Sequence, residues 1–162
     1  MTAPGIGHWV ETNPSDFDDW DALLQLLGDC FAGMEGRIDP PSSLNHLTAA
    51  DLARKSETGD LFLMRITGRP VACAFGLATP ACYHVGKLAV AAPQRGQGMA
   101  REILDAAARA AGSHGLTCLE VQTRVELREN HRLFRRLGFS LVAGTSHAGH
   151  SRARSLTFRR AL

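Results

Sequence analysis

The segment 83–124 constrains the fold more than any other part of the chain. An apolar run, 83–90, leads into a loop, 91–98, that contains a proline and two glycines. The stretch 98–112 then repeats apolar residues at helical spacing, and a second strand-like run, 118–124, follows. A strand, a helix and a strand in this order leave enough chain for a crossover connection, so the two strands are expected to be parallel.

The rest of the chain supplies antiparallel strands and further helices. Two apolar runs flank the turn 67–70 and predict a β-hairpin over 60–78. A helix capped by Ser15 or Asp16 is expected to end by Gly33. Further helices are expected over 49–57 and 130–137, and further strands over 8–11, 139–145 and 153–162. The sequence therefore predicts one α/β (α+β) domain, 1–162, whose mixed, mostly antiparallel sheet of about seven strands has helices on both faces.

Composition places the chain among ordinary globular proteins. It has 162 residues, of which 44% are hydrophobic and 21% charged. No apolar stretch approaches the roughly 20 residues that span a bilayer, and residues 1–11 lack the pattern of a secretory signal. The widely spaced cysteines form neither a zinc pattern nor a disulfide framework, so we expect small buried thiols in a reducing cytoplasm. These are Cys30, Cys73, Cys82 and Cys118.

Charge is distributed unevenly along the chain. Residues 1–91 carry a net charge of −5 and residues 92–162 one of +7, within a total of +2. A basic half suits an anionic ligand such as a nucleotide or a phosphate, and solvated surface arginines are the alternative. The arginines of 128–136 also suggest a nucleic-acid face. Because Glu129 interrupts that run and aromatic residues are few, no nucleic-acid partner is expected.

The loop 95–100 carries the strongest chemical signal. Its glycines, Gly96 and Gly98, allow a ligand to approach the backbone closely. The helix that begins there offers free N–H groups and the positive end of its dipole, an arrangement that suits a pyrophosphate. Arg95 and Arg101 add positive charge at the rim. The spacing matches neither the dinucleotide fingerprint nor the Walker motif, and a tight turn with exposed arginines is the alternative.

Two motifs resemble those of a known family. The pattern R-x-x-G-x-A at 95–100, after an apolar strand and Pro93, resembles the acyl-CoA-binding motif of the GNAT superfamily of N-acyltransferases. The run NHRLFRRLGF at 130–139 is similar to that superfamily's second motif. The resemblance covers essentially the whole chain. It implies a GNAT fold with a splayed parallel pair of strands, an acceptor-side segment over 1–60 and an acyl-CoA-binding core over 83–139.

The same resemblance implies roles for individual residues. Acetyl-CoA is the implied co-substrate, with its pantetheine arm between the splayed strands and its thioester carbonyl polarised by the Val90 N–H. A free amine attacks the thioester directly, without an acyl-enzyme, and no metal takes part. The residues expected to pair with the pantetheine, to cradle the pyrophosphate or to flank the sulfur are Leu88, Ala89, Val90, Arg95, Gly96, Gln97, Gly98, Met99, Ala100, Arg101, Asn130 and Phe134.

The proton chemistry departs from the family pattern at one position. Relatives carry a tyrosine acid four residues before the glycine of the second motif, where this chain has Phe134. The single tyrosine, Tyr83, lies at the start of the strand before the loop. Glu120, in a Leu-Glu-Val similar to that of ribosomal-protein N-terminal acetyltransferases, is the expected base, and a glutamate paired with Arg124 is the alternative. His84 is the second candidate base, because imidazole titrates near neutrality.

The acceptor is expected to bind beside the loops 34–43 and 145–152, which lie on the acceptor side in the superfamily. The acidic first half of the chain favours a small amine or a peptide N-terminus. His147 and His150 have no third ligand nearby in the sequence, so no metal site is expected. A homodimer is compatible with the resemblance, and a membrane partner is not expected. The alternative to an enzyme is a non-catalytic acyl-CoA-binding regulatory module.

Overall fold

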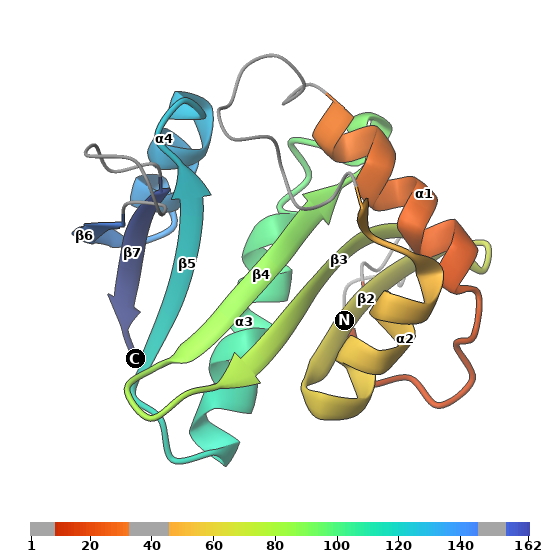
Figure 1. The fold of residues 1–162 in the computed structure, drawn as a ribbon, viewed down its shortest axis with the longest axis horizontal. Coiled ribbons are helices and arrows are strands. Elements are labelled where there is room, and N and C mark those ends of the chain that lie inside the picture. The colour runs from red at the N-terminus through yellow and green to blue at the C-terminus, as the bar shows by residue number, and fades with distance from the viewer. Residues whose placement is uncertain (1–8, 33–45, 146–154) are drawn as a thin grey trace, which may run out of the picture.

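One mixed sheet organises the protein (Figure 1). The computed structural model describes residues 9–32, 46–145 and 155–162. Within them the strand order is β1-β2-β3-β4-β5-β7-β6, and each neighbouring pair is antiparallel except β4 and β5, which run parallel. The strands are β1 (Glu11–Thr12), β2 (Asp60–Ile66), β3 (Arg69–Ala78), β4 (Tyr83–Val90), β5 (Cys118–Arg124), β6 (Ser140–Thr145) and β7 (Ser155–Ala161).

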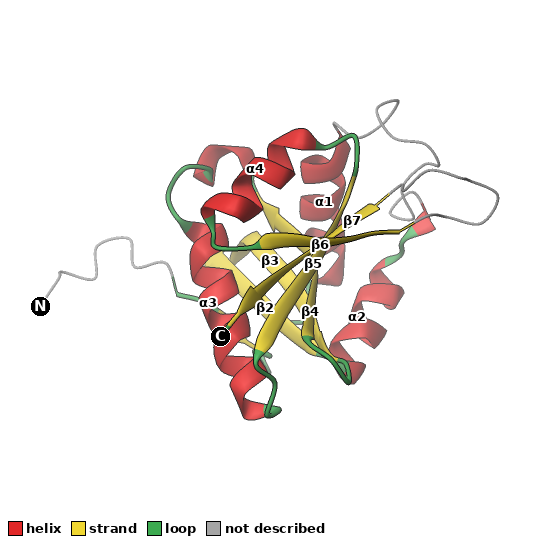
Figure 2. Ribbon diagram, turned by 90° about the vertical axis from the view of Figure 1, so that its left-hand side faces the viewer, coloured by secondary structure: helices red, strands yellow, loops and turns green. Residues whose placement is uncertain are grey.

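Helices cover both faces of the sheet (Figure 1, Figure 2). Helices α1 and α2 pack on β2, β3 and β4 from one side, here named the α1/α2 face. Helix α3 packs on β2 to β5 from the other side, the α3 face. Helix α4 lies on the α3 face, because its Phe134 belongs to the same apolar cluster as Ile103 of α3. The helices are α1 (Trp20–Phe31), α2 (Ala49–Thr58), α3 (Met99–Ser113) and α4 (Arg128–Arg136), with a short 3-10 turn η3 (Ala92–Gln94).

Strand alternation assigns each side chain of β4 and β5 to one face. Val85 and Val121 belong to the apolar cluster under α3, and Ala89 belongs to the cluster under α1 and α2. Because successive side chains of a strand point to opposite faces, His84 and Glu120 point toward the α1/α2 face. The two candidate bases therefore lie on the same side of the sheet.

The parallel strands pair only where they begin. Residues 83–85 of β4 are the Cα partners of residues 119–121 of β5. Beyond these residues the two strands diverge, and β4 continues beside β3 while β5 continues beside β7 (Figure 1). The result is a V-shaped opening between the carboxyl ends of β4 and β5.

A bulge in β4 lies where the strands diverge. Gly86 and Ala89 of β4 are the partners of residues 75 and 73 of β3, so Lys87 and Leu88 face a single β3 residue. Such an extra residue bends a strand and increases its twist. Lys87 has a φ of 53°, in the left-handed region, which an L-residue other than glycine adopts at a cost. We attribute the departure of β4 from β5 to this bulge.

The predicted fold class is confirmed, with small differences at the ends of elements. The hairpin, the parallel pair and both later helices lie where the sequence predicts them. Helix α1 begins at Trp20 rather than near Ser15, because the side chain of Asp19 accepts a hydrogen bond from the Ala22 N–H at 3.1 Å and caps the helix there. The first strand is shorter than predicted and is limited to β1. In the described ranges no helix combines the length and the apolar character needed to cross a membrane.

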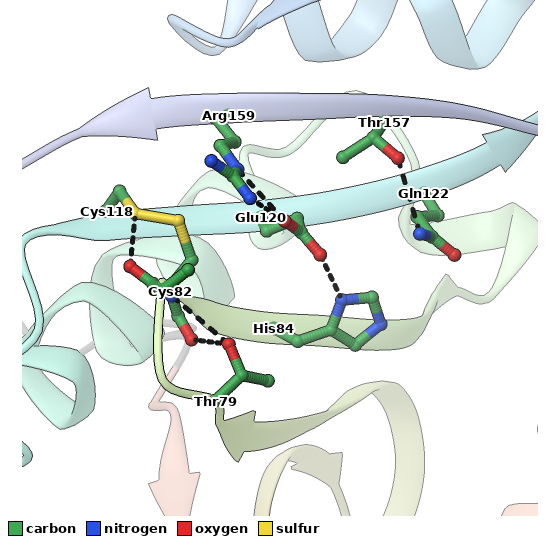
Figure 3. A network of polar contacts seen from close by, with 9 residues as sticks. Thr79, Cys82, His84, Cys118, Glu120, Gln122, Thr157 and Arg159 are labelled. Atoms are coloured by element: carbon green, nitrogen blue, oxygen red, sulfur yellow. Dashed lines mark hydrogen bonds and ion pairs between the residues drawn. A yellow bond between two sulfur atoms is a disulfide. The ribbon is translucent and has the colours of Figure 1, made fainter. Parts of the chain in front are cut away.

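The expectation of four free thiols is wrong for two of them. Cys82 and Cys118 form a disulfide that joins the residue before β4 to the first residue of β5 (Figure 3). The sequence did not indicate this bond, because the two cysteines lie 36 residues apart and only the parallel pairing of β4 and β5 brings them together. Cys30 and Cys73 are free. The prediction of a reducing cytoplasm rested partly on four free thiols, and the disulfide removes that support.

We expect the disulfide to contribute substantially to stability. It closes a loop of 36 residues, and bonds of this kind stabilise by roughly 2–4 kcal/mol, mainly by restricting the unfolded chain. The double variant Cys82→Ser/Cys118→Ser should lose that amount in urea unfolding, and a reductant should lower wild-type stability but not that of the variant. Cys30→Ser is the control and should keep the response to reductant. Four reactive thiols in the denatured, unreduced protein would contradict the bond.

Candidate active site

The glycine loop and the first turn of α3 form an open backbone surface. Gly96 and Gly98 both have a φ of 82°, which favours glycine, and Gly98 is the N-cap of α3. A Cβ built on either glycine meets nothing within 4 Å, so the space above the loop is free. The first N–H groups of α3 have no carbonyl partner within the helix. This part of the structure fits a phosphate-bearing ligand, as the sequence predicts.

The backbone of Val90 faces the opening between β4 and β5. The next residue, Ala91, donates its N–H to the Val71 carbonyl at 2.8 Å. Because backbone groups point alternately to the two sides of a strand, the N–H and C=O of Val90 point away from β3. Its carbonyl accepts hydrogen bonds from Arg95 Nε at 3.1 Å and Cys30 Sγ at 3.4 Å. The Val90 oxygen already accepts hydrogen bonds. The Val90 N–H is therefore the group of this residue that could donate a hydrogen bond to a thioester carbonyl.

Three polar side chains meet on the α1/α2 face across β4, β5 and β7 (Figure 3). His84 Nδ1 lies 3.4 Å from Glu120 Oε1. Arg159 donates from Nε to Glu120 Oε2 at 3.0 Å, and its Nη2 forms an ion pair with the same oxygen at 2.9 Å. The side chain of Glu120 is 17% exposed and that of His84 33% exposed. The structure thus brings the two predicted bases together in one cluster, named here the His84–Glu120–Arg159 cluster.

The partner of Glu120 differs from the one that the sequence suggested. Arg124 was considered as that partner, but Arg159 is the Cα partner of Glu120 on β7 and its guanidinium makes the contact. Arg124 instead keeps Nε and Nη2 buried without a hydrogen-bond partner in the part of the chain that the structure describes. Sequence reasoning missed Arg159 because the register of β7 against β5 depends on tertiary pairing. The polar residues at alternate positions, Ser155, Thr157 and Arg159, were the available signal.

Gln122 and Thr157 are two further polar residues on β5 and β7, of which Gln122 is exposed and Thr157 is buried. Gln122 donates from Nε2 to Thr157 Oγ1 at 3.3 Å (Figure 3). Both lie beyond the cluster toward the carboxyl end of β5. Helices α1 and α2 pack mainly on β2, β3 and β4, so this part of the face extends past their main contacts.

The structure separates Tyr83 from the cluster. Its side chain is fully buried on the α3 face, and its hydroxyl donates to Asp60 Oδ2 at 2.5 Å. Burial, together with the Asp60 carboxylate, raises the pKa of Tyr83 well above its usual range. His114 stacks on the ring with a centroid separation of 5.9 Å. These contacts give Tyr83 a structural role and no access to the opening.

Two predicted cofactor residues lie on α4. Asn130 donates from Nδ2 to Thr123 Oγ1 at 3.1 Å and so ties α4 to the end of β5. Phe134 is 6% exposed, and its ring centre lies 5.8 Å from that of Phe139 and 6.0 Å from that of Phe158. Phe134 thus packs in the apolar core under the opening. Its ring carries no hydroxyl that could protonate a leaving group.

The free cysteines Cys30 and Cys73 are poor nucleophiles. Burial raises the pKa of the Cys73 thiol, which lies in the fully buried core, and raises that of Cys30 despite the neighbouring Arg95. The other two cysteines form the disulfide. Burial, with a smaller effect of the Lys55 charge, lowers the pKa of Lys87, which stands where relatives often carry an acidic residue. None of the four cysteines is placed as a thiolate nucleophile.

Several sequence predictions fall outside the described residues. The acceptor loop 34–43, most of the loop 145–152, and both His147 and His150 lie there. In the described ranges no three His, Cys, Asp or Glu side chains are grouped to hold a metal ion.

Comparison with known proteins identifies the family. The sequence profile of the Acetyltransferase (GNAT) family matches residues 20–139, so the chain belongs to the GNAT acetyltransferase family. Members of this family are acetyl-CoA-dependent acyltransferases, and the chain is an enzyme of that class. Comparison with curated proteins finds no match.

Solved structures share the fold at low sequence identity. An IAA acetyltransferase from Bacillus cereus is 18% identical with a TM-score of 0.63, covering 95% of this chain and 99% of its own. A GNAT family acetyltransferase from Elizabethkingia anophelis with acetyl-CoA bound is 14% identical with a TM-score of 0.63, covering 95% and 97%. An acetyltransferase from Streptococcus agalactiae is 13% identical with a TM-score of 0.72, covering 94% and 98%. These similarities establish the GNAT fold.

The single tyrosine of the chain provides a direct test of its burial. Because the pKa of Tyr83 is raised, the folded state holds the proton more tightly than the unfolded state, whose tyrosine titrates near pH ~10. Stability should therefore fall as pH rises above about 10, and tyrosinate absorbance should appear together with unfolding. A reversible tyrosinate titration near pH ~10 in the folded protein would contradict the burial. Tyr83→Phe should leave the rate of acetyl transfer unchanged.

Proposed function

We propose that this chain transfers the acetyl group of acetyl-CoA to a primary amine by direct attack within a ternary complex. The observation that carries the proposal is the opening between β4 and β5 directly beside the glycine loop and the N-terminus of α3. One edge of this opening offers backbone N–H groups to a thioester, and its far end offers N–H groups to a pyrophosphate. The His84–Glu120–Arg159 cluster lies at its closed end, on the acceptor side.

The residues present fit the cofactor that the family uses. The main-chain N–H groups of 96–101 would hold the pyrophosphate, with Arg95 and Arg101 at the rim. The backbone of Leu88 and Val90 would pair with the pantetheine, and the Val90 N–H would stabilise the developing oxyanion. Ala89 contributes a buried methyl group that fixes β4 against the α1/α2 core. When bound, acetyl-CoA supplies an activated acyl group whose thiolate is a good leaving group.

Direct attack is supported by the state of the cysteines. The Cys82–Cys118 disulfide removes two thiols, and burial keeps the Cys30 and Cys73 thiols protonated. An acyl-enzyme formed on cysteine would need a thiolate beside the thioester, which none of the four provides. The amine therefore has to attack the thioester itself, and a base has to take its proton.

A general acid is the part of the family pattern that this chain lacks. Phe134 occupies the tyrosine position, and Tyr83 is fixed to Asp60 on the other face of the sheet. We propose that solvent protonates the departing thiolate. The acyl transfer rate should then rise with pH and show no alkaline limb due to a tyrosine acid.

The acceptor is proposed to be a small amine or a peptide N-terminus that approaches on the α1/α2 face. The exposed polar side chain of Gln122, beyond the cluster on β5, supports entry from this side. A non-catalytic acyl-CoA-binding module remains the alternative, and turnover separates the two. A homodimer stays a prediction that sedimentation can test.

Acetyl-CoA should stabilise the protein against thermal unfolding, and this stabilisation should depend on Gly98. At about 100 times its dissociation constant a ligand adds roughly 2.7 kcal/mol, which a thermal shift detects. Gly98→Val should abolish the shift with acetyl-CoA, because a φ of 82° favours glycine and a β-branched side chain there would block the approach of the pyrophosphate to the backbone.

The matched control for that experiment is Gly115→Val. Gly115 has a φ of 72° and open space around it, but it follows the other end of α3. Both variants should lose stability through backbone strain, and only Gly115→Val should keep the acetyl-CoA shift. If wild type responds to ATP and not to acetyl-CoA, or if both variants respond, the proposed cofactor site is wrong.

A further inference from the structure

We propose that His84 is the general base of this reaction and that Glu120 is a positioning residue that acts through it. The inference rests on the proposed acetyl transfer. The sequence left open whether His84 or Glu120 is the base, and the structure distinguishes the base from the residue that positions it. It follows from the orientation of the imidazole and from the contacts that already occupy the carboxylate.

The two ring nitrogens of His84 face different surroundings. Nδ1 lies 3.4 Å from Glu120 Oε1, so a proton on Nδ1 is donated to the carboxylate. Nε2 lies beside Gly86, because a Cβ atom built on Gly86 would be 3.7 Å from this nitrogen. Gly86 follows His84 along β4 toward the open end, and Figure 3 shows this nitrogen on the Gln122 side of the ring, away from the disulfide. The nitrogen that is free to accept a proton therefore faces the opening.

Both oxygens of Glu120 are engaged by side chains of the protein. Oε2 accepts a hydrogen bond from Arg159 Nε and forms an ion pair with Arg159 Nη2, and Oε1 faces His84. The carboxylate is also less exposed than the imidazole, 17% against 33% of the side chain. A base must reach the amine directly or through one water. His84 meets this condition better than Glu120, whereas Glu120 is placed to hold the imidazole in one tautomer, as a carboxylate does for histidine in other acyl-transfer sites.

The proton inventory of the step balances without any further reactant. The amine nitrogen forms a bond to the carbonyl carbon of the thioester, and the carbon–sulfur bond breaks with its electron pair on sulfur. His84 Nε2 accepts the proton that the amine nitrogen loses. Glu120 offsets the positive charge of the imidazolium through the Nδ1 contact. Water then carries the proton from Nε2 to the thiolate or to bulk solvent, which restores the neutral ring.

The charged groups around His84 are few in the described part of the chain. Glu120 faces it from β5, and Arg159 on β7 faces Glu120. On β3 its Cα partner is Leu77, which does not titrate. Because the ammonium group of the acceptor is the same in every variant, a change in the pH–rate profile that appears only in the His84 variant reports the loss of that side chain.

The first test measures the kinetics of acetyl transfer from acetyl-CoA to tyramine, to spermidine and to an unblocked peptide, in the wild type and in each variant. His84→Ala should lower kcat by roughly 10²-fold, remove the ascending limb, and leave the KM for acetyl-CoA unchanged. Added imidazole should restore part of the rate. Glu120→Gln should keep the ascending limb and lose roughly tenfold in kcat, because the amide oxygen still accepts from Nδ1. Imidazole should not rescue that variant.

His114→Ala is the matched control. His114 also faces a carboxylate, with Nε2 3.7 Å from Asp60, but it lies beside Tyr83 and not at the opening. Its loss should leave kcat and the pH profile unchanged. If Glu120→Gln removes the ascending limb and His84→Ala keeps it, Glu120 is the base and the proposal is overturned. If wild type binds no acetyl-CoA, the proposed function fails instead.

A second measurement distinguishes the roles of His84 and Glu120 even if the enzyme acetylates none of the three acceptors. Nitrogen-15 spectra of the imidazole should show the neutral His84 ring protonated on Nδ1, and Glu120→Ala should change this tautomer. A neutral ring protonated on Nε2 in the wild type would overturn the assignment, because that nitrogen then has no free electron pair for the amine proton.

Discussion

The interruption of pairing between β4 and β5 is the constraint on which the rest of the structure depends. Parallel neighbours inside a sheet normally satisfy each other's backbone groups along their whole length. Here pairing ends after Val85 and Val121, and the bulge at Lys87 turns β4 away. Backbone groups that a regular sheet would consume, the Val90 N–H among them, are thereby left for a ligand. The left-handed φ of Lys87 has a cost in conformational energy, and the pairing and packing of the surrounding sheet hold the residue in this conformation.

The two ends of this opening carry different chemistry. At the closed end the disulfide and the three paired residues hold the strands together, and His84 and Glu120 are cross-strand partners there. At the open end the chain passes through η3 into the glycine loop and α3, whose first turn presents N–H groups. An extended ligand that binds both ends, with a phosphate group at the loop and a reactive group near the cluster, matches this layout. Acetyl-CoA has that shape and that order of groups.

Much of the fold could be predicted from the sequence, because local patterns specify it. The apolar run before the glycine loop, the helical repeat of 98–112 and the capping residue Thr48 each specify local structure through their own side chains. The start of α1 was misplaced because four acidic or hydroxyl residues, Ser15, Asp16, Asp18 and Asp19, are candidate caps, and Asp19 is the one that caps the helix. The cofactor loop was predictable for the same reason, since glycine spacing and a helix start are local features.

The candidate catalytic cluster could be predicted only in part. The resemblance of Leu-Glu-Val indicated Glu120 and the chemistry of imidazole indicated His84, each as a separate candidate, but their contact depends on the register of β4 against β5. Arg159 and the disulfide were missed because each depends on a partner more than 30 residues away in sequence. The opposite error was to consider Tyr83 for catalysis from its position near the loop, whereas alternation buries it under α3. Tertiary register, rather than composition, decides which polar residues meet.

A crystal structure of the complex with acetyl-CoA tests the central claim most directly. The account predicts the pantetheine arm between β4 and β5, the pyrophosphate on the N–H groups of 96–101, and the thioester oxygen about 3 Å from the Val90 nitrogen. His84 Nε2 should face the thioester carbon from the α1/α2 face. Acetyl-CoA bound elsewhere, or β4 and β5 paired beyond Val85 so that no opening remains, would contradict it.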